Sequence, residues 1–182
     1  MTKILNQNAT LNIPIRQEIF ERADTLLANK LEKHSKVLAG RIDAHIKDGK
    51  IQTFNQRLAE IERRKGLDPS YLTVCEVGKS GNKHFHTIFF LDGNKTRSVW
   101  SLFEDANRVM NNMIGDKSKK KSGLIDFCNH DFGNGIMISR NLNDKDAIDE
   151  LSRKISYLAK EKQKENVKGK TFFSSRVRKP TK

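Results

Sequence analysis

Residues 71–91, YLTVCEVGKSGNKHFHTIFFL, predict a β-hairpin. Both flanks are rich in β-branched and aromatic residues, and the GKSGN stretch at residues 78–82 is typical of a turn. Pairing the flanks across this five-residue loop sets Glu76 opposite His84 and diagonal to His86. Because side chains alternate between the two faces of a strand, all three are expected to point the same way. A loop one residue longer or shorter would turn Glu76 to the other face.

These three side chains form a candidate metal site. A His-x-His pair alone is more often polar surface, but a carboxylate in register favours a metal site. Two imidazoles and one carboxylate leave open positions on a divalent ion, and a catalytic metal needs such positions to accept substrate oxygens. The predicted ligands are His84, His86 and Glu76.

The composition favours a polyanionic partner. The chain has 182 residues, a formal net charge of +13 and a pI near 9.8, which indicate nucleic acid first and an anionic membrane surface second. No stretch approaches the roughly 18 consecutive apolar residues of a spanning helix, and the first residues lack the apolar core of a signal peptide. We therefore expect a cytoplasmic protein without a membrane partner. Cys75 and Cys128 lack metal or redox spacing and are interpreted as small buried residues.

Basic residues gather in two places. Residues 152–182 hold eleven Lys or Arg against two Glu, and residues 117–121 read KSKKK. A charge run is often only a solvated face, yet the clustering favours phosphate contacts. The candidate DNA contacts here are Arg153, Lys154, Lys164, Arg176, Lys119, Lys120 and Lys121.

Hydrophobic periodicity predicts an α+β fold. Helices are expected over residues 14–30, 50–65, 94–114 and 144–164, and strands over residues 35–46, 71–77, 83–91, 124–128 and 135–139, the last two as a second hairpin. The order indicates a ferredoxin- or RRM-like βαββαβ core, an antiparallel sheet with helices on one face, extended by an N-terminal and a C-terminal helix. The predicted organisation is an arm (1–13), one domain (14–166) and a basic tail (167–182).

The last predicted helix carries a candidate nucleophile. Tyr157 lies on a face shared with basic residues at three- and four-residue intervals. Neighbouring cations favour the phenolate that would attack phosphorus, and Lys160, one turn on, would assist or neutralise the phosphate. On the helix alone, Tyr157 is better interpreted as an interfacial aromatic residue with a solvated hydroxyl.

Several motifs in this order resemble a known family. They are VLAGRID at 37–43, HFHTIFFL at 84–91, SYLAK at 156–160 and FSSR at 173–176. The chain is similar to HUH endonucleases of the single-tyrosine class, and most similar to inovirus-type gene II replication proteins and the YagK/YfjJ C-terminal domain.

The resemblance implies a rolling-circle replication initiator. It implies Mg²⁺ or Mn²⁺ on His84 and His86, and Tyr157 as the nucleophile that forms a 5′-phosphotyrosyl link with single-stranded DNA or an origin hairpin. Lys160 would be its electrostatic helper, and a host replication helicase is a further candidate partner. No small-molecule cofactor is implied. Arg41, Asp43 and Arg176 match the motifs without an assigned role and are grouped with the DNA contacts.

A second hypothesis is a non-catalytic module that binds single-stranded nucleic acid, or a repressor of a phage or plasmid replicon. It would need exposed aromatic side chains on the central strands for base stacking, and Phe85 and Phe89 are the candidates. A cytosolic hydrolase that uses the same metal is the third hypothesis, with Asp43 as its only candidate base.

Overall fold

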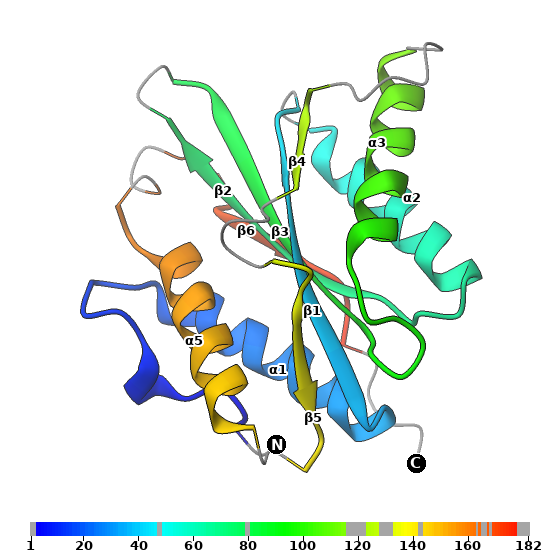
Figure 1. The fold of residues 1–182 in the computed structure, drawn as a ribbon. Helices are drawn as coiled ribbons and strands as arrows, with labels where there is room; N and C mark the ends of the chain where they lie inside the picture. Colours follow the sequence, from blue (N-terminus) through cyan, green and yellow to red (C-terminus); the bar gives the residue numbers. More distant parts are fainter. Residues whose placement is uncertain are drawn as a thin grey trace.

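The computed structural model describes residues 3–46, 49–78, 81–115, 123–127, 133–141, 144–162, 164, 167 and 169–177. Their fold is α+β, as predicted (Figure 1). The elements are η1 (Gln7–Ala9), α1 (Gln17–Lys33), β1 (Lys36–Ala44), α2 (Ile51–Arg64), β2 (Ser70–Val77), β3 (Lys83–Asp92), α3 (Trp100–Ile114), β4 (Ile125–Phe127), β5 (Ile136–Ser139), α5 (Lys145–Ala159) and β6 (Phe172–Ser174).

The described strands form one antiparallel sheet of six strands. Its order is β4-β1-β3-β2-β6, and β5 also pairs with β1. The predicted succession of strand, helix, two strands, helix and strand is confirmed from β1 to β4. In the central hairpin Glu76 pairs with His84 and Val74 with His86, which confirms the predicted register. The hairpin therefore decides which side chains of β2 and β3 share a face.

Helices cover both faces of the sheet: the two helices of the predicted core, α2 and α3, share one face as predicted, and the two added helices, α1 and α5, cover the other. Figure 1 shows α2 and α3 on one side and α1 and α5 on the other. Each pair buries its own apolar cluster, because strand residues alternate between the two cores: Ile88 packs on the α1/α5 side, whereas Phe85 and Phe89 pack on the α2/α3 side. The side chains of the predicted metal ligands, Glu76, His84 and His86, project toward the α1/α5 side, beyond the end of that core.

The start of α1 and the end of α5 differ from the prediction, and one contact explains both differences. Helix α1 begins at Gln17 rather than Pro14, and α5 ends at Ala159 rather than near Lys164. The backbones of Ile15 and Lys160 pair in an isolated bridge, and the Arg16 N–H donates to the Ala159 carbonyl at 2.8 Å. A long-range backbone pairing thus replaces the local helical hydrogen bonds of both segments.

The predicted second hairpin is wrong. Strands β4 and β5 do not pair with each other in the described residues, because both pair with β1, β4 opposite its residues 42–44 and β5 opposite residues 36–39. They form an interrupted edge of the sheet. Asn143, which precedes the helix predicted over residues 144–164, lies outside the described residues, and the side chain of Asp144 caps α5 by accepting from the Ala147 N–H.

Both chain ends pack on the fold more than predicted. In the arm, Leu5 is buried, and the N–H groups of Ile4 and Leu5 donate to Asp24. In the segment predicted as a tail, β6 pairs with β2 as an added strand. Cys75 is buried, as predicted, and Cys128 lies outside the described residues.

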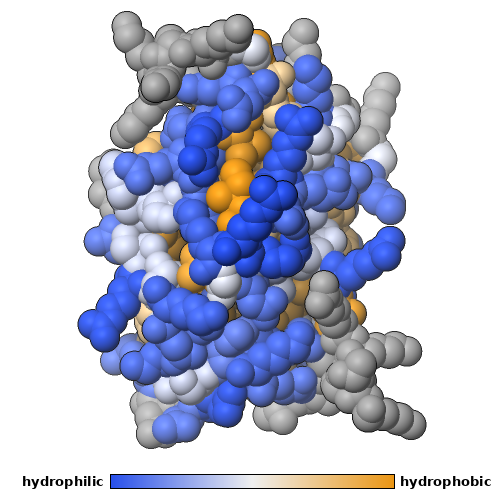
Figure 2. All heavy atoms as spheres, turned by 90° about the vertical axis from the view of Figure 1, so that its right-hand side faces the viewer, coloured by the Kyte–Doolittle hydropathy of each residue, from blue (hydrophilic) through white to orange (hydrophobic). Residues whose placement is uncertain are grey.

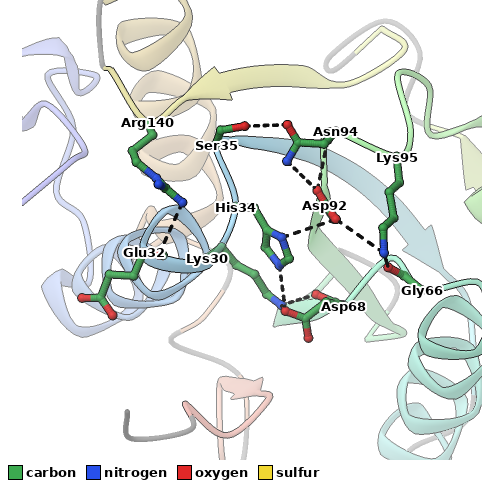
Figure 3. Close-up of polar contacts among 10 residues, drawn as sticks. All are labelled: Lys30, Glu32, His34, Ser35, Gly66, Asp68, Asp92, Asn94, Lys95 and Arg140. Carbon is green, nitrogen blue, oxygen red and sulfur yellow. Dashed lines mark hydrogen bonds and ion pairs between the residues drawn. The ribbon is translucent and has the colours of Figure 1, made fainter. Parts of the chain in front are cut away.

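A charged network ties the end of the sheet that lies farthest from the hairpin loop (Figure 3). Buried Lys30 donates to Asp68, and the two ring nitrogens of His34 face the carboxylates of Asp68 at 2.9 Å and Asp92 at 3.3 Å. Asp68 has a φ of 42°, a left-handed conformation that these contacts hold. The network connects α1 with the loops that enter β2 and leave β3. We interpret it as structural.

Helices α2 and α3 meet at a strip of apolar residues between hydrophilic flanks (Figure 2). Ile61 and Val109 line a groove of about 410 Å³ here. Nearby, Glu62 is fully buried, and burial together with a hydrogen bond to Asp105 raises its pKa to about 7. A buried acid of this kind disfavours the folded state most when it is ionised.

We expect Glu62→Gln to stabilise the protein at pH 8 but much less at pH 5. The folded-state pKa of Glu62 lies above its unfolded value, so its ionisation on raising the pH costs more in the folded protein. The measurement is the thermal midpoint of both proteins at each pH, with an expected gain of a few degrees at pH 8. Equal thermal midpoints of wild type and Glu62→Gln at pH 8 would contradict the raised pKa of Glu62.

No helix among the described residues is long and apolar enough to cross a membrane.

Candidate functional site

The hairpin and β1 bring five of the predicted site side chains to one face of the sheet. Asp43 of β1 pairs with His86 of β3, and Glu76 of β2 pairs with His84. Arg41 lies two residues before Asp43 on the same face, because side chains repeat every second residue. The predicted grouping of Glu76 with the two histidines on one face is therefore confirmed, and Asp43 and Arg41 join them.

His86 is clamped between two carboxylates. Its Nδ1 lies 2.8 Å from Asp43 Oδ2 and its Nε2 lies 3.4 Å from Glu76 Oε2. Burial alone would lower the pKa of His86, but the hydrogen bonds with Asp43 and Glu76 outweigh it, so the pKa is raised. The Arg41 guanidinium, whose Nη2 lies 3.0 Å from Nδ1, acts in the opposite direction. The imidazolium form is thus favoured in this arrangement.

Asp43 is held from two sides. Arg41 donates to it through Nε at 2.8 Å and Nη2 at 2.7 Å, and His86 supplies the third contact. Burial would raise the pKa of Asp43, yet these hydrogen bonds lower it well below the usual range. Asp43 is therefore ionised at neutral pH, and its role is to orient Arg41 and His86.

Glu76 is paired with a buried lysine. Lys164 Nζ lies 3.0 Å from Glu76 Oε1 and also donates to the Lys160 carbonyl at 2.8 Å, with a side chain that is fully buried. Against the effect of burial, the contacts with His86 and Lys164 lower the pKa of Glu76 to about 2. Lys160 Nζ is a further cation, 4.0 Å from Glu76 Oε2. Glu76 is the point at which the hairpin and the segment after α5 meet.

His84 differs from His86 in its surroundings. Its ring meets that of His45 edge to face, with centroids 4.7 Å apart, and burial and the charges of His45 and His86 lower its pKa. A neutral imidazole is therefore favoured. Gly78 leaves room for this ring, since a Cβ at that position would lie 3.0 Å from His84 Nε2.

Tyr157 reaches the same place from the last turn of α5. Its side chain is 45% exposed, and Lys160 Nζ lies 3.8 Å from its ring centroid. Because Lys160 is fixed by its backbone bridge to Ile15, the end of α5 and both side chains are positioned by the N-terminal segment. The cation over the ring adds an attraction that orients the phenol.

One cavity of about 300 Å³ connects these groups. Its lining residues are Arg41, Glu76, Gly78, His84, His86, Tyr157 and Lys160. An exposed phenol, three cationic or imidazole side chains on the sheet and the lysine that directly follows α5 thus share one opening. Such a lining can hold a phosphate group beside a nucleophile.

The predicted metal ligands share a face but do not form a metal-binding group. Among the residues that the structure describes, no set of three or more His, Cys, Asp or Glu side chains is arranged to hold a metal ion. Glu76 and His86 are engaged with each other and with Lys164 and Asp43. These ion pairs would have to exchange before His84, His86 and Glu76 could surround an ion.

The other predicted DNA contacts divide into three groups. Lys164 is a buried partner of Glu76, and Asp43 is an ion-pair partner of Arg41, so both side chains are engaged within the protein. Arg153 and Arg176 are exposed, as a phosphate contact requires, and Lys154 Nζ lies 3.7 Å from Glu150. The basic loop residues Lys119, Lys120 and Lys121 lie outside the described residues.

Sequence reasoning missed part of the site. Alternation along the strand predicted over residues 35–46 puts His45 on the face of Arg41 and Asp43, but no role was assigned to His45, and the pairing of Lys164 with Glu76 was not predicted. The alternation along β1 was the only available signal for His45. Nothing local signals the second contact, because Glu76 and Lys164 are 88 residues apart and the helix was expected to continue to Lys164.

The clamp on His86 gives the protein a pH-dependent stability. Since the folded-state pKa of His86 is raised, its pairs stabilise the fold fully below about pH 6.5, and this stabilisation is lost as the pH rises through the folded-state value. We therefore expect wild type to be more stable than His86→Gln at pH 6, with a smaller difference at pH 9. Urea unfolding at both pH values measures this. A difference that is independent of pH would show that His86 stays neutral.

No family model, no curated protein and no solved structure matches this chain.

Proposed function

We propose that the protein is a DNA-nicking and strand-transferring endonuclease of the HUH single-tyrosine kind, which acts on single-stranded DNA. The observation that carries the proposal is the shared cavity, in which exposed Tyr157 lies with His84, His86, Glu76 and the cationic side chains of Arg41 and Lys160. A formal net charge of +13 supports a nucleic-acid substrate.

The chemistry is an in-line displacement at phosphorus. Tyr157 Oη forms a bond to the phosphorus and gives its proton to solvent, the bond to the 3′ oxygen breaks, and that oxygen takes up a proton to become a 3′-hydroxyl. The 5′ phosphate stays on Tyr157. Arg41 and Lys160 oppose the negative charge that develops on the phosphate oxygens. The reverse attack by a 3′-hydroxyl rejoins the strand.

The proposal assigns Mg²⁺ or Mn²⁺ to His84, His86 and Glu76. The donor types suit a divalent ion with open positions, although in the described arrangement these side chains are occupied by their ion pairs. When bound, such an ion supplies Lewis-acid polarisation of a phosphate oxygen. Release of the His86 proton and of the Lys164 contact would accompany its binding, because a ligand imidazole must be neutral.

The fold supports the proposal at the level of topology. The order β4-β1-β3-β2, with α2 and α3 on one face, agrees with a ferredoxin-like βαββαβ core. Under this interpretation α1, α5 and β6 are additions, and α1 and α5 cover the second face up to the site. A replication initiator of a phage or plasmid is the corresponding biological role, with origin DNA and a host helicase as proposed partners.

The alternative of a non-catalytic binder keeps the charge argument but loses its proposed stacking residues. Phe85 and Phe89 are buried against α2 and α3, so neither can stack on a base. The hydrolase alternative rested on Asp43 as a base, and Asp43 is engaged by Arg41 and His86.

The test is covalent capture. The protein is incubated with a labelled library of single-stranded oligonucleotides and with Mn²⁺, and the products are separated under denaturing conditions. We expect a protein–DNA adduct that peptide mapping assigns to Tyr157. An adduct on another residue, or none with a library that includes the origin of the element encoding the protein, would count against the proposal.

A further inference from the structure

A second cavity, of about 690 Å³, lies beside the edge strand β6. Phe173 of β6 and Tyr71 of β2 line it from the sheet, and both rings are partly exposed. Phe173 pairs with Thr73 in the ladder and shares its face, the one that α2 covers. Gln52 and Gln56 of α2 complete the opposite wall. The cavity is thus separate from the one that holds Tyr157.

The charge of this cavity is positive. Lys170 and Arg176 line it, and both are exposed. None of the described lining residues carries a carboxylate. Two cations without a local counter-charge in the lining favour an anionic ligand. Arg176 was singled out by the FSSR motif, and the structure gives it this location.

The remaining groups suit a nucleobase. Two aromatic rings offer faces for stacking, the carboxamides of Gln52 and Gln56 can each donate and accept hydrogen bonds, and the cations can pair with phosphate. Burial raises the pKa of Tyr71, so its hydroxyl stays protonated and can donate a hydrogen bond. A ligand with an aromatic base and a phosphate satisfies all three kinds of group.

We propose that this cavity binds one nucleotide of single-stranded DNA, with its base against Phe173 and Tyr71 and its phosphate near Arg176. The choice of DNA over a free nucleotide rests on the proposed function. The cavity deepens that function, because a nucleotide held here keeps the strand on the protein while a neighbouring phosphate enters the Tyr157 cavity.

The chain itself connects the two cavities. Lys164 contacts Glu76 in the first, and the carbonyl of Thr171, in the lining of the second, accepts a hydrogen bond from the Cys75 N–H, one residue before Glu76. From there β6 runs along β2 (Figure 1). A strand of DNA that follows this edge can therefore reach from one cavity to the other.

Binding is measured by the fluorescence anisotropy of a labelled oligothymidylate of about ten nucleotides. The variants are Phe173→Leu, which removes the ring but keeps an apolar side chain, and Arg176→Gln. We expect affinity to fall roughly 5- to 100-fold for Phe173→Leu, as for loss of one stacked base. Arg176→Gln should weaken binding and reduce its salt dependence. Lys145→Gln, which removes an exposed cation at the first residue of α5, is the matched control and should change affinity less.

Thymidine monophosphate and inorganic phosphate serve as competitors. Weak competition by the first and none by the second is expected for a site that recognises base and phosphate within a strand. Competition by the free nucleotide as strong as that by the oligonucleotide would overturn the assignment to DNA. Unchanged affinity in both Phe173→Leu and Arg176→Gln would overturn the site itself.

Photocrosslinking does not depend on these variants. An oligonucleotide with a photoreactive 5-iodouracil should link to Phe173 or Tyr71, and links only to other residues would overturn the proposal. The outcome is separable from that of the nicking proposal. Crosslinking here without an adduct on Tyr157 would leave a binding protein, and an adduct without these crosslinks would leave a nicking enzyme that holds DNA elsewhere.

Discussion

We expect that replacing Tyr157 with phenylalanine abolishes the proposed covalent protein–DNA adduct and leaves DNA binding intact. In the proposed reaction the phenol oxygen is the atom that bonds to phosphorus, and among the residues lining the Tyr157 cavity no other side chain carries a hydroxyl. The change removes one atom from a side chain that is 45% exposed, so the fold should be unaffected. The readout is a labelled oligonucleotide that migrates with the protein on a denaturing gel.

The matched control for this prediction is Tyr71→Phe. Tyr71 lines the other cavity, and the two residues are the only tyrosines of the chain. We expect Tyr71→Phe still to form the adduct at saturating DNA, because it keeps both the ring proposed to hold a base and the Tyr157 hydroxyl. Lys160→Met should give a slower reaction, because the cation near the phosphate is lost while the nucleophile remains. An adduct that persists in Tyr157→Phe, or disappears in Tyr71→Phe, would assign the nucleophile elsewhere.

The hairpin was predictable because its information is local. Strand periodicity and a five-residue turn at residues 78–82 are enough to fix the register, and the structure pairs Glu76 with His84 as expected. The succession of elements from β1 to β4 followed from periodicity in the same way. Elements whose residues contact near neighbours in the sequence could therefore be predicted from the sequence alone.

The ion pairs of the site depend on long-range contacts and were not predictable. His86 was expected to be a free metal ligand, but its two nitrogens face Asp43, 43 positions earlier in the chain, and Glu76. Neither the strand pattern nor the charge pattern of the sequence indicates which carboxylate a given imidazole will contact. Strand pairing between β1 and β3 decides this, and that pairing is set by the whole sheet.

The errors at the helix ends have a related cause. Periodicity in residues 144–164 continues past Ala159, so an uninterrupted helix was expected. The bridge between Ile15 and Lys160 ends it, and this turns Lys164 from a surface position into the interior. A basic residue predicted to meet solvent phosphate therefore became the partner of Glu76. One tertiary contact changed both the secondary structure and the assigned role.

The pair of Glu76 with Lys164 carries the second large prediction. Glu76→Gln leaves the fully buried Lys164 ammonium without its carboxylate, and we expect unfolding free energy to fall by about 2 kcal/mol. This value is below the usual cost for a buried pair because Glu76 borders an open cavity. The double variant Glu76→Gln with Lys164→Met should recover most of the loss, since no unpaired charge remains.

The pH dependence of that loss identifies its origin. The pKa of Glu76 is lowered to about 2 in the folded protein, so its ionised form stabilises the fold above about pH 4.5, and the contribution disappears as the pH falls toward 2. Urea unfolding at pH 7 should therefore separate wild type from Glu76→Gln, and the gap should narrow near pH 3. The stabilising contribution of His86 is lost as the pH rises, whereas that of Glu76 is lost as the pH falls. Measuring the Glu76 variants at pH 7 and below in a His86→Gln background therefore isolates the contribution of Glu76. If Glu76→Gln and the double variant with Lys164→Met lose the same unfolding free energy at pH 7, the unpaired Lys164 ammonium does not cause the loss. The ion pair between Glu76 and Lys164 would then contribute nothing to stability.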